Sequence, residues 1–139
     1  MSIVQTQTTS FKAELYEGIH DLLNDEIRIA LYTGFADLNA ATTAYSATNE
    51  ITGAGYTAGG EVMTGVTVQS SGTTAYVSFA NVTWNPASFT TRCALIYNAT
   101  KANRSVAVLD FGSDKTATNT FTITMPANTP TAALIRSSY

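Results

Sequence analysis

Apolar residues first recur along this chain at helical spacing. They do so at Phe11, Leu15, Ile19 and Leu22, which places them on one face of a helix. Ser10 is a suitable N-cap. Gly18 weakens the helix, so its stability must depend on packing against the rest of the protein. The pattern predicts one short amphipathic helix over residues 11–22.

From Glu26 onward the alternation of apolar and polar residues has a period of two, as expected for β-strands. Strands are predicted at residues 27–32, 62–68, 74–79, 92–97, 106–111, 120–125 and 132–136. Turn-forming residues after the second and fourth of these strands predict two hairpins. Short strands joined by tight turns favour a mainly β protein, an antiparallel β-sandwich or jelly-roll-like domain of about seven to eight strands.

Two segments do not follow either period. Residues 1–10 are polar and rich in Thr and Gln, and they are predicted to form a flexible N-terminal arm. Residues 11–139 then form a single β-sandwich domain. Within it, residues 33–60 are irregular, with at most a short strand near residues 50–52. A loop of this length is usually functional, so it is a candidate contact surface beside the arm.

The predicted hairpin of residues 92–111 is apolar on both faces. Cys93, Leu95 and Tyr97 alternate with Ala94 and Ile96 in its first strand. A two-layer sandwich normally leaves one face of each sheet in water, so another part of the molecule must cover the outer face. We expect the helix of residues 11–22 to be this cover, and a partner subunit is the alternative.

Composition narrows the class of protein. The chain has 139 residues, of which 12% are charged and 45% are hydrophobic, and its net charge is −3. It is therefore long enough for one core, too apolar for disorder and without an apolar run long enough to span a membrane. No cluster of Lys and Arg is available to bind nucleic-acid phosphates. Residues 1–10 have no secretory signal pattern.

The residue types that usually carry catalysis are sparse. His20 is the only histidine, and a lone His on a helix is more often a surface or packing residue. Cys93 is the only cysteine, interpreted as a small buried hydrophobic residue. Glu50, Glu61 and Asp110 could be paired as carboxylates, but any domain with this many acids permits such pairs. The sequence therefore predicts no enzyme, no catalytic residues, no cofactor and no metal site.

Four aromatic residues lie in or beside predicted loops: Tyr45, Tyr56, Trp84 and Phe89. If exposed, they could stack on sugars or anchor an interface, and if buried, they would close the ends of the sandwich. The glycines of residues 53–60 are spaced too irregularly for a phosphate loop, and we expect them to supply turns with positive φ.

Several strings of residues resemble a family of small virion structural proteins of tailed bacteriophages. The strings are Phe11-Lys12-Ala13-Glu14-Leu15, Ile27-Arg28-Ile29-Ala30-Leu31-Tyr32-Thr33, Thr43-Ala44-Tyr45-Ser46, Gly55-Tyr56-Thr57-Ala58-Gly59-Gly60, Ala94-Leu95-Ile96-Tyr97-Asn98 and Val106-Ala107-Val108-Leu109-Asp110-Phe111-Gly112. The resemblance extends from Phe11 to Arg136. Cys93 departs from it, since relatives are expected to have Gly at this position.

The resemblance implies a virion component. A compact, acidic, Thr-rich β domain suits a capsid decoration (cement) protein, made in the host cytoplasm and bound to the outer surface of the phage head. The expected partners are the major capsid protein and copies of the chain itself, as a homotrimer or homodimer, and neither nucleic acid nor a membrane is expected. A tail or neck component and a carbohydrate-binding module are the alternatives.

Overall fold

The computed structural model describes residues 2–138, so Met1 of the expected arm and Tyr139 at the end of the expected domain lie outside it. Helix α1 spans Thr9–Tyr16. The strands are β1 (Thr6–Gln7), β2 (Ile27–Tyr32), β3 (Glu61–Val62), β4 (Thr67–Ser71), β5 (Thr74–Ser78), β6 (Val82–Trp84), β7 (Phe89–Asn98), β8 (Arg104–Ala117), β9 (Phe121–Ile123) and β10 (Ile135–Ser137).

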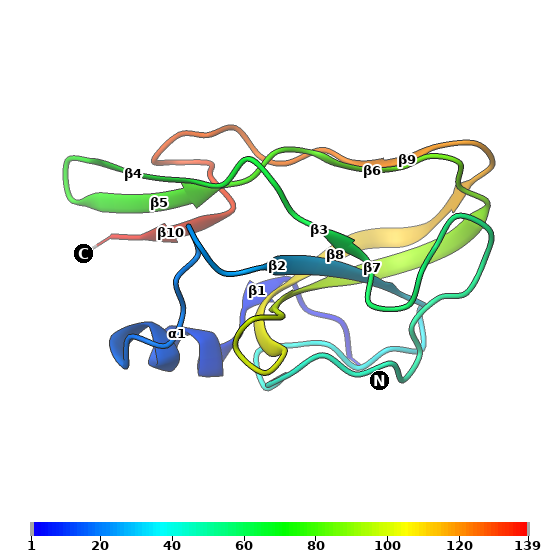
Figure 1. Cartoon of the computed structure of the whole chain (residues 1–139), viewed down its shortest axis with the longest axis horizontal. Helices are drawn as coiled ribbons and strands as arrows, with labels where there is room; N and C mark the ends of the chain where they lie inside the picture. Colours follow the sequence, from blue (N-terminus) through cyan, green and yellow to red (C-terminus); the bar gives the residue numbers. More distant parts are fainter. Residues whose placement is uncertain (1, 139) are drawn as a thin grey trace.

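The strands form two facing layers (Figure 1). The first layer is a five-stranded antiparallel sheet in the order β1-β8-β7-β2-β3. The second layer consists of a three-stranded sheet, β10-β5-β4, and a two-stranded sheet, β6-β9, which lie end to end (Figure 1). This confirms a mainly β, sandwich-like fold with one short helix near the N-terminus. Residues 2–138 hold more strands than expected, because β1, β3 and β6 have only two or three residues each and are too short to show alternation.

Both predicted hairpins form, but residues 62–68, expected to be one strand, are divided between β3 and the start of β4. Strand β7 pairs with β8, and β4 pairs with β5 across the two-residue turn Gly72-Thr73. Strands β7 and β8 are longer than expected, because β8 continues past a large bulge. On β8, residues 111–114 lie between the residues that pair with Cys93 and Thr91, and Gly112 takes a φ of 84° there.

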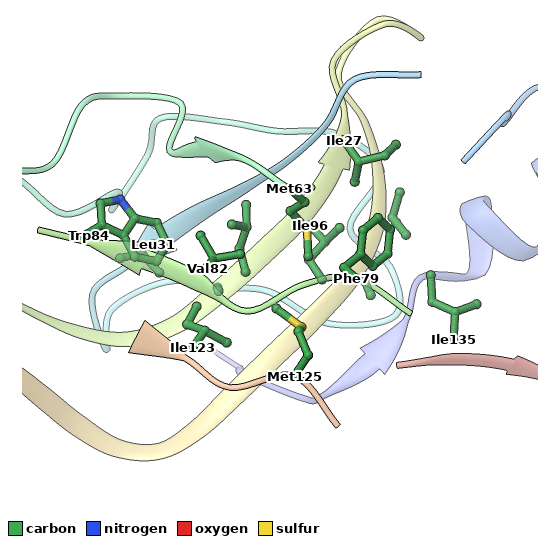
Figure 2. Close-up of a cluster of buried hydrophobic side chains, with 14 of the residues drawn as sticks. Ile27, Leu31, Met63, Phe79, Val82, Trp84, Ile96, Ile123, Met125 and Ile135 are labelled. Atoms are coloured by element: carbon green, nitrogen blue, oxygen red, sulfur yellow. The ribbon is translucent and has the colours of Figure 1, made fainter. Parts of the chain in front are cut away.

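The core lies between the two layers. Its side chains come from β2, β7 and β8 on one side and from the second layer on the other (Figure 2). The labelled members are Ile27, Leu31, Met63, Phe79, Val82, Trp84, Ile96, Ile123, Met125 and Ile135. A set of this size can supply most of the hydrophobic stabilisation of a domain of this length.

Helix α1 is shorter than the predicted helix, and both of its ends have local causes. Thr8, not Ser10, is the N-cap, and its hydroxyl accepts a hydrogen bond from the backbone N–H of Phe11. At the other end Gly18 has a φ of 71°, and the N–H groups of Gly18 and Ile19 bond to the carbonyls of Leu15 and Glu14. This is the Schellman arrangement that terminates a helix at glycine.

The expectation of a flexible arm is wrong for residues 2–10. Thr6 and Gln7 form strand β1 on the edge of the first layer, paired with Val108 and Ala107. Thr8 is completely buried, and its hydroxyl shares a hydrogen bond of 2.9 Å with the hydroxyl of Ser105. The polar residues of this segment therefore satisfy the open edge of β8 rather than remaining in water.

The helix does not cover the outer face of the β7–β8 hairpin, so the expectation that residues 11–22 form this cover is wrong. A second apolar cluster, which includes Ala30, Tyr32, Cys93, Leu95, Tyr97 and Val108, lies on this face. The side chains packed over it come from the N-terminal segment and the long loop, among them Ile3, Ala36, Leu38 and Tyr45. Helix α1 instead packs at one end of the sandwich, where Phe11 joins the core between the layers.

Candidate interaction surface

His20 lies in the most extensive buried polar network of residues 2–138. Its side chain is fully buried, and Nε2 lies 2.8 Å from a carboxylate oxygen of Glu14. The side-chain amide of Asn98 donates to Nδ1 of His20 and to Asp25. Because Nδ1 accepts this hydrogen bond, the proton of the neutral ring is on Nε2 and points to Glu14. The geometry makes His20 a packing residue, one of the two roles expected for it.

The same network holds Asp25 and two cations of the β7–β8 turn region. Lys101 donates to Asp25 at 2.8 Å, and Arg104 donates to Glu14 at 3.0 Å. Burial raises the pKa of Asp25, but hydrogen bonds from Asn98 and Lys101 and from the N–H of Asp21 outweigh it and lower the pKa to about 2. The network thus connects the segment after α1 to the hairpin turn, with each charge paired.

Glu50 lies in a second cluster, formed by tyrosines of the long loop and the first layer. The hydroxyls of Tyr45 and Tyr56 and the N–H of Gly59 all donate to its carboxylate. Burial, with the contact to Glu50, raises the pKa of both tyrosines above the ordinary value. Tyr45 also stacks on Tyr97, with ring centroids 4.7 Å apart. These contacts fix the loop on the sheet and leave Glu50 without a free oxygen for acid–base chemistry.

The other carboxylates singled out in the sequence do not join Glu50. Asp110 pairs with Arg92 on the neighbouring strand, and the N–H of Gly112 is the main reason why its pKa is lowered. Glu61 is exposed on β3, opposite Ile29. Within residues 2–138 no three His, Cys, Asp or Glu side chains come close enough to hold a metal ion. No helix of the described chain is long and apolar enough to cross a membrane.

Cys93 is buried as expected, and burial raises the pKa of its thiol to about 11. A thiol in this state is a poor nucleophile at neutral pH.

The four aromatic residues in or beside the loops pack against other side chains and do not form an exposed binding surface. Trp84 is 1% exposed and Phe89 is 6% exposed, and their rings meet edge to face at a centroid distance of 6.5 Å. Tyr56 packs against both rings, and Tyr45 is half-buried on Tyr97. The side chains that could have stacked on sugars are therefore used for packing.

The glycines of residues 53–60 have the positive φ values expected of them, except that φ of Gly53 is close to extended. Gly60 shows why no other residue fits: a Cβ atom there would lie 1.8 Å from the carbonyl oxygen of Ile29. The segment follows the surface of β2 closely, and it does not form a phosphate cradle.

An open groove of about 740 Å³ lies between α1, β1 and β10. Lys12, Tyr16 and Arg136 contribute side chains to it, and Tyr16 is 94% exposed. The described residues that line the groove include no His, Cys, Asp or Glu.

The second layer has the most distinctive surface, because it is almost free of charge. Residues 62–91 and 116–135 contain no Asp, Glu, Lys, Arg or His, although about a quarter of the residues in an average domain are charged. These stretches include β4, β5, β6 and β9, and Arg136 in β10 is the one charged residue in the strands of this layer. The other charges of the chain lie on the first layer, on α1 and on the connecting segments.

Side chains on the outside of this layer are small and polar. In β6 and β9, Val82, Trp84 and Ile123 point into the core, while Thr83 and Thr122 point outward and lie 3.1 Å apart through their hydroxyl oxygens. We call the exposed residues of this side the neutral face, and they include Gln69, Ser71, Thr83, Thr122, Thr124 and Asn128. Depletion of charge distinguishes the centres of protein interfaces from the rest of a surface.

No sequence motif marks the neutral face. The sequence signal for it is the absence of charged residues from two long stretches, residues 62–91 and 116–135, in which apolar and polar residues alternate as in strands. The long loop, proposed instead as a contact surface, has its backbone satisfied within the molecule. The N–H of Ser105 bonds to Thr43, the N–H of Tyr45 bonds to Asn103, and the N–H of Thr9 bonds to Ala40.

Comparison of the chain with protein-family models, with curated proteins and with solved structures finds no match.

Proposed function

We propose that the chain is a structural component of a tailed-phage virion, a capsid decoration protein that binds the outer surface of the head through its neutral face. The observation that supports this most is the second layer of the sandwich, whose strands carry a single charged residue, Arg136. A face of Thr, Ser, Asn and Gln side chains can be buried without the large desolvation cost of removing charges from water. The phage assignment itself rests on the resemblance of the sequence strings.

The rest of the molecule supports a structural role. The only histidine and the only cysteine are buried, and three prominent carboxylates are bound by neighbouring groups, namely Glu14, Asp25 and Glu50. The polar networks tie both the N-terminal segment and the long loop to the first layer. A rigid domain with one neutral face is suited to bridging the repeated subunits of a shell.

The proposal is tested by adding one charge to the neutral face. Thr122→Lys introduces a cation on the outside of β9, where the side chain is exposed and its removal disturbs only a surface hydrogen bond. Binding to heads that lack the protein should weaken by about tenfold or more, because an unpaired charge becomes buried in the contact. Binding is measured by cosedimentation of the labelled protein with heads.

Thr43→Lys is the matched control, since Thr43 is an exposed threonine on the long loop over the other layer. It should bind heads as tightly as the unmodified protein. Equal binding by both variants would rule out the neutral face as the contact. Binding of the unmodified protein to purified tails and not to heads would reject decoration in favour of a tail or neck component.

A further inference from the structure

Strand β4 forms a free edge of the three-stranded sheet and lacks the usual protection of such an edge. Proteins protect edge strands by making them short, by placing charges or proline on them, or by bulges. Strand β4 has five residues, Thr67–Ser71, with no charge, no proline and a regular register to β5. The other free edges within residues 2–138 are shorter, and β10 also carries Arg136.

The pairing with β5 determines which backbone groups of β4 face outward. Ser71 and Thr74 flank the two-residue turn, so they form a hydrogen-bonded pair. In an antiparallel ladder such pairs alternate with non-hydrogen-bonded ones. The N–H and C=O groups of Ser71, Gln69 and Thr67 therefore point to β5, and those of Val68 and Ser70 point to the open edge.

The side chains of β4 are also available. Gln69, Ser70 and Ser71 are exposed. Val68 lies opposite Val77 on the core-facing side of the sheet, yet it remains 49% exposed. An apolar side chain and a row of unpaired backbone groups thus occur together on one edge.

We infer that a second copy of this chain pairs with this edge, β4 against β4 in antiparallel orientation about a two-fold axis at Gln69. In this register Val68 lies opposite the partner's Ser70, and the pair exchanges both of its backbone hydrogen bonds. Gln69 lies opposite the partner's Gln69 in a non-hydrogen-bonded pair, where side chains approach most closely. A glutamine amide both donates and accepts, so it is complementary to itself.

The composition of the edge favours an identical partner. Self-pairing about a two-fold axis places the residue on the axis opposite its own copy, so a charged residue there would repel itself. The absence of any charge between residues 62 and 91 removes this repulsion. The pairing joins two three-stranded sheets into one continuous sheet and covers both Val68 side chains. The inference does not depend on the virion assignment.

A pair of opposite charge changes tests both the dimer and its axis. Sedimentation velocity over a range of concentrations should show the unmodified protein shifting from monomer to dimer, because edge pairing alone buries a small area. Gln69→Lys and Gln69→Glu should each remain monomeric, since like charges then face each other. An equal mixture of the two variants should again form dimers, because Lys now faces the partner's Glu.

Two further variants separate this effect from misfolding. Thr83→Lys adds the same charge to β6 of the same layer and should keep the dimer. Ser70→Pro removes an outward N–H without interrupting the ladder to β5, and it should abolish the dimer. Circular dichroism and the melting temperature of each monomer confirm that it is folded. The inference is overturned if the unmodified protein is monomeric at every concentration, if Gln69→Lys still dimerises, or if the mixture stays monomeric.

Discussion

At the scale of single residues, buried polar side chains form hydrogen bonds between segments that are far apart in the sequence. Asn98 is fully buried and uses its whole amide, with the oxygen accepting from the N–H groups of Thr100 and Lys101 and the nitrogen donating to His20 and Asp25. An unpaired buried amide would cost about 1–3 kcal/mol, so this arrangement strongly favours one conformation of the turn.

Asp25 should make the free energy of unfolding depend on pH under acidic conditions. Its pKa is about 2 in the folded protein against 3.8 ordinarily, so the folded state binds its proton less readily than the unfolded state. Its contribution is present above pH 4 and is lost as the pH falls from about 4 to 2. In Asp25→Asn the free energy of unfolding should fall by roughly 1–2 kcal/mol less over this pH range than in the unmodified protein, after allowance for solvent screening.

Urea unfolding at a series of pH values measures this effect. Asp114→Asn is the control, because Asp114 is exposed on β8 and makes no hydrogen bond with the residues described. It should leave the pH dependence of the unfolding free energy as it is. An unchanged slope for Asp25→Asn would show that the carboxylate does not hold its partners in solution.

Not every residue environment could be predicted from the sequence. The burial of Cys93 was predictable, because its neighbours in the chain are apolar. The hydrogen bonds of His20 were not, because its partners Glu14 and Asn98 come from different elements and meet only after folding. Gly18 was recognised as unfavourable for the helix, but its role as the terminating residue depends on a φ of 71°.

At the scale of elements, α1 is held by its packing and not by its own propensity. Eight residues are too few for a stable isolated helix. Phe11 is fully buried in the core between the layers, and its ring lies 4.9 Å from the ring of His20. Leu15 is only partly buried at the margin of the same core. The attachment of the helix therefore depends mainly on one side chain.

This arrangement predicts a ranking of two substitutions. Phe11→Ala should lower the free energy of unfolding by about 3–4 kcal/mol, because it leaves a cavity in the core. Leu15→Ala should cost less, roughly 1–2 kcal/mol, because part of the side chain is already in water. Chemical denaturation measures both values. A larger loss for Leu15→Ala than for Phe11→Ala would mean that the helix packs through a different face.

The strands were largely predictable and the packing around them was not. Strand β2 and the two hairpins follow from alternation and turn residues, which are local signals. The two-faced apolar pattern of β7 correctly indicated a covered outer face. The identity of the cover depends on long-range backbone pairing, such as the N–H of Leu38 to Ser2 and the N–H of Val4 to Leu38, which no local pattern shows.

At the scale of the whole molecule, the two layers differ in charge as well as in strand order. The outer face of the first layer is covered by the N-terminal segment and the long loop, and the layer carries ion pairs such as Arg28–Glu26 and Arg92–Asp110. The second layer carries only Arg136 in its strands and presents β4 as an open edge. The proposed head contact uses the outside of the second layer, and the proposed dimer uses its edge, so one molecule can make both contacts.

We propose that this chain decorates the phage head with its neutral face against the capsid. A cryo-electron microscopy reconstruction of the virion tests it directly, because the asymmetric sandwich can be placed in density with its orientation. We expect density for the chain in many symmetry-related copies on the outer head surface, with β6 and β9 toward the capsid and α1 away from it. Density for the chain only in the tail or neck, or on the head with the charged first layer toward the capsid, would contradict it.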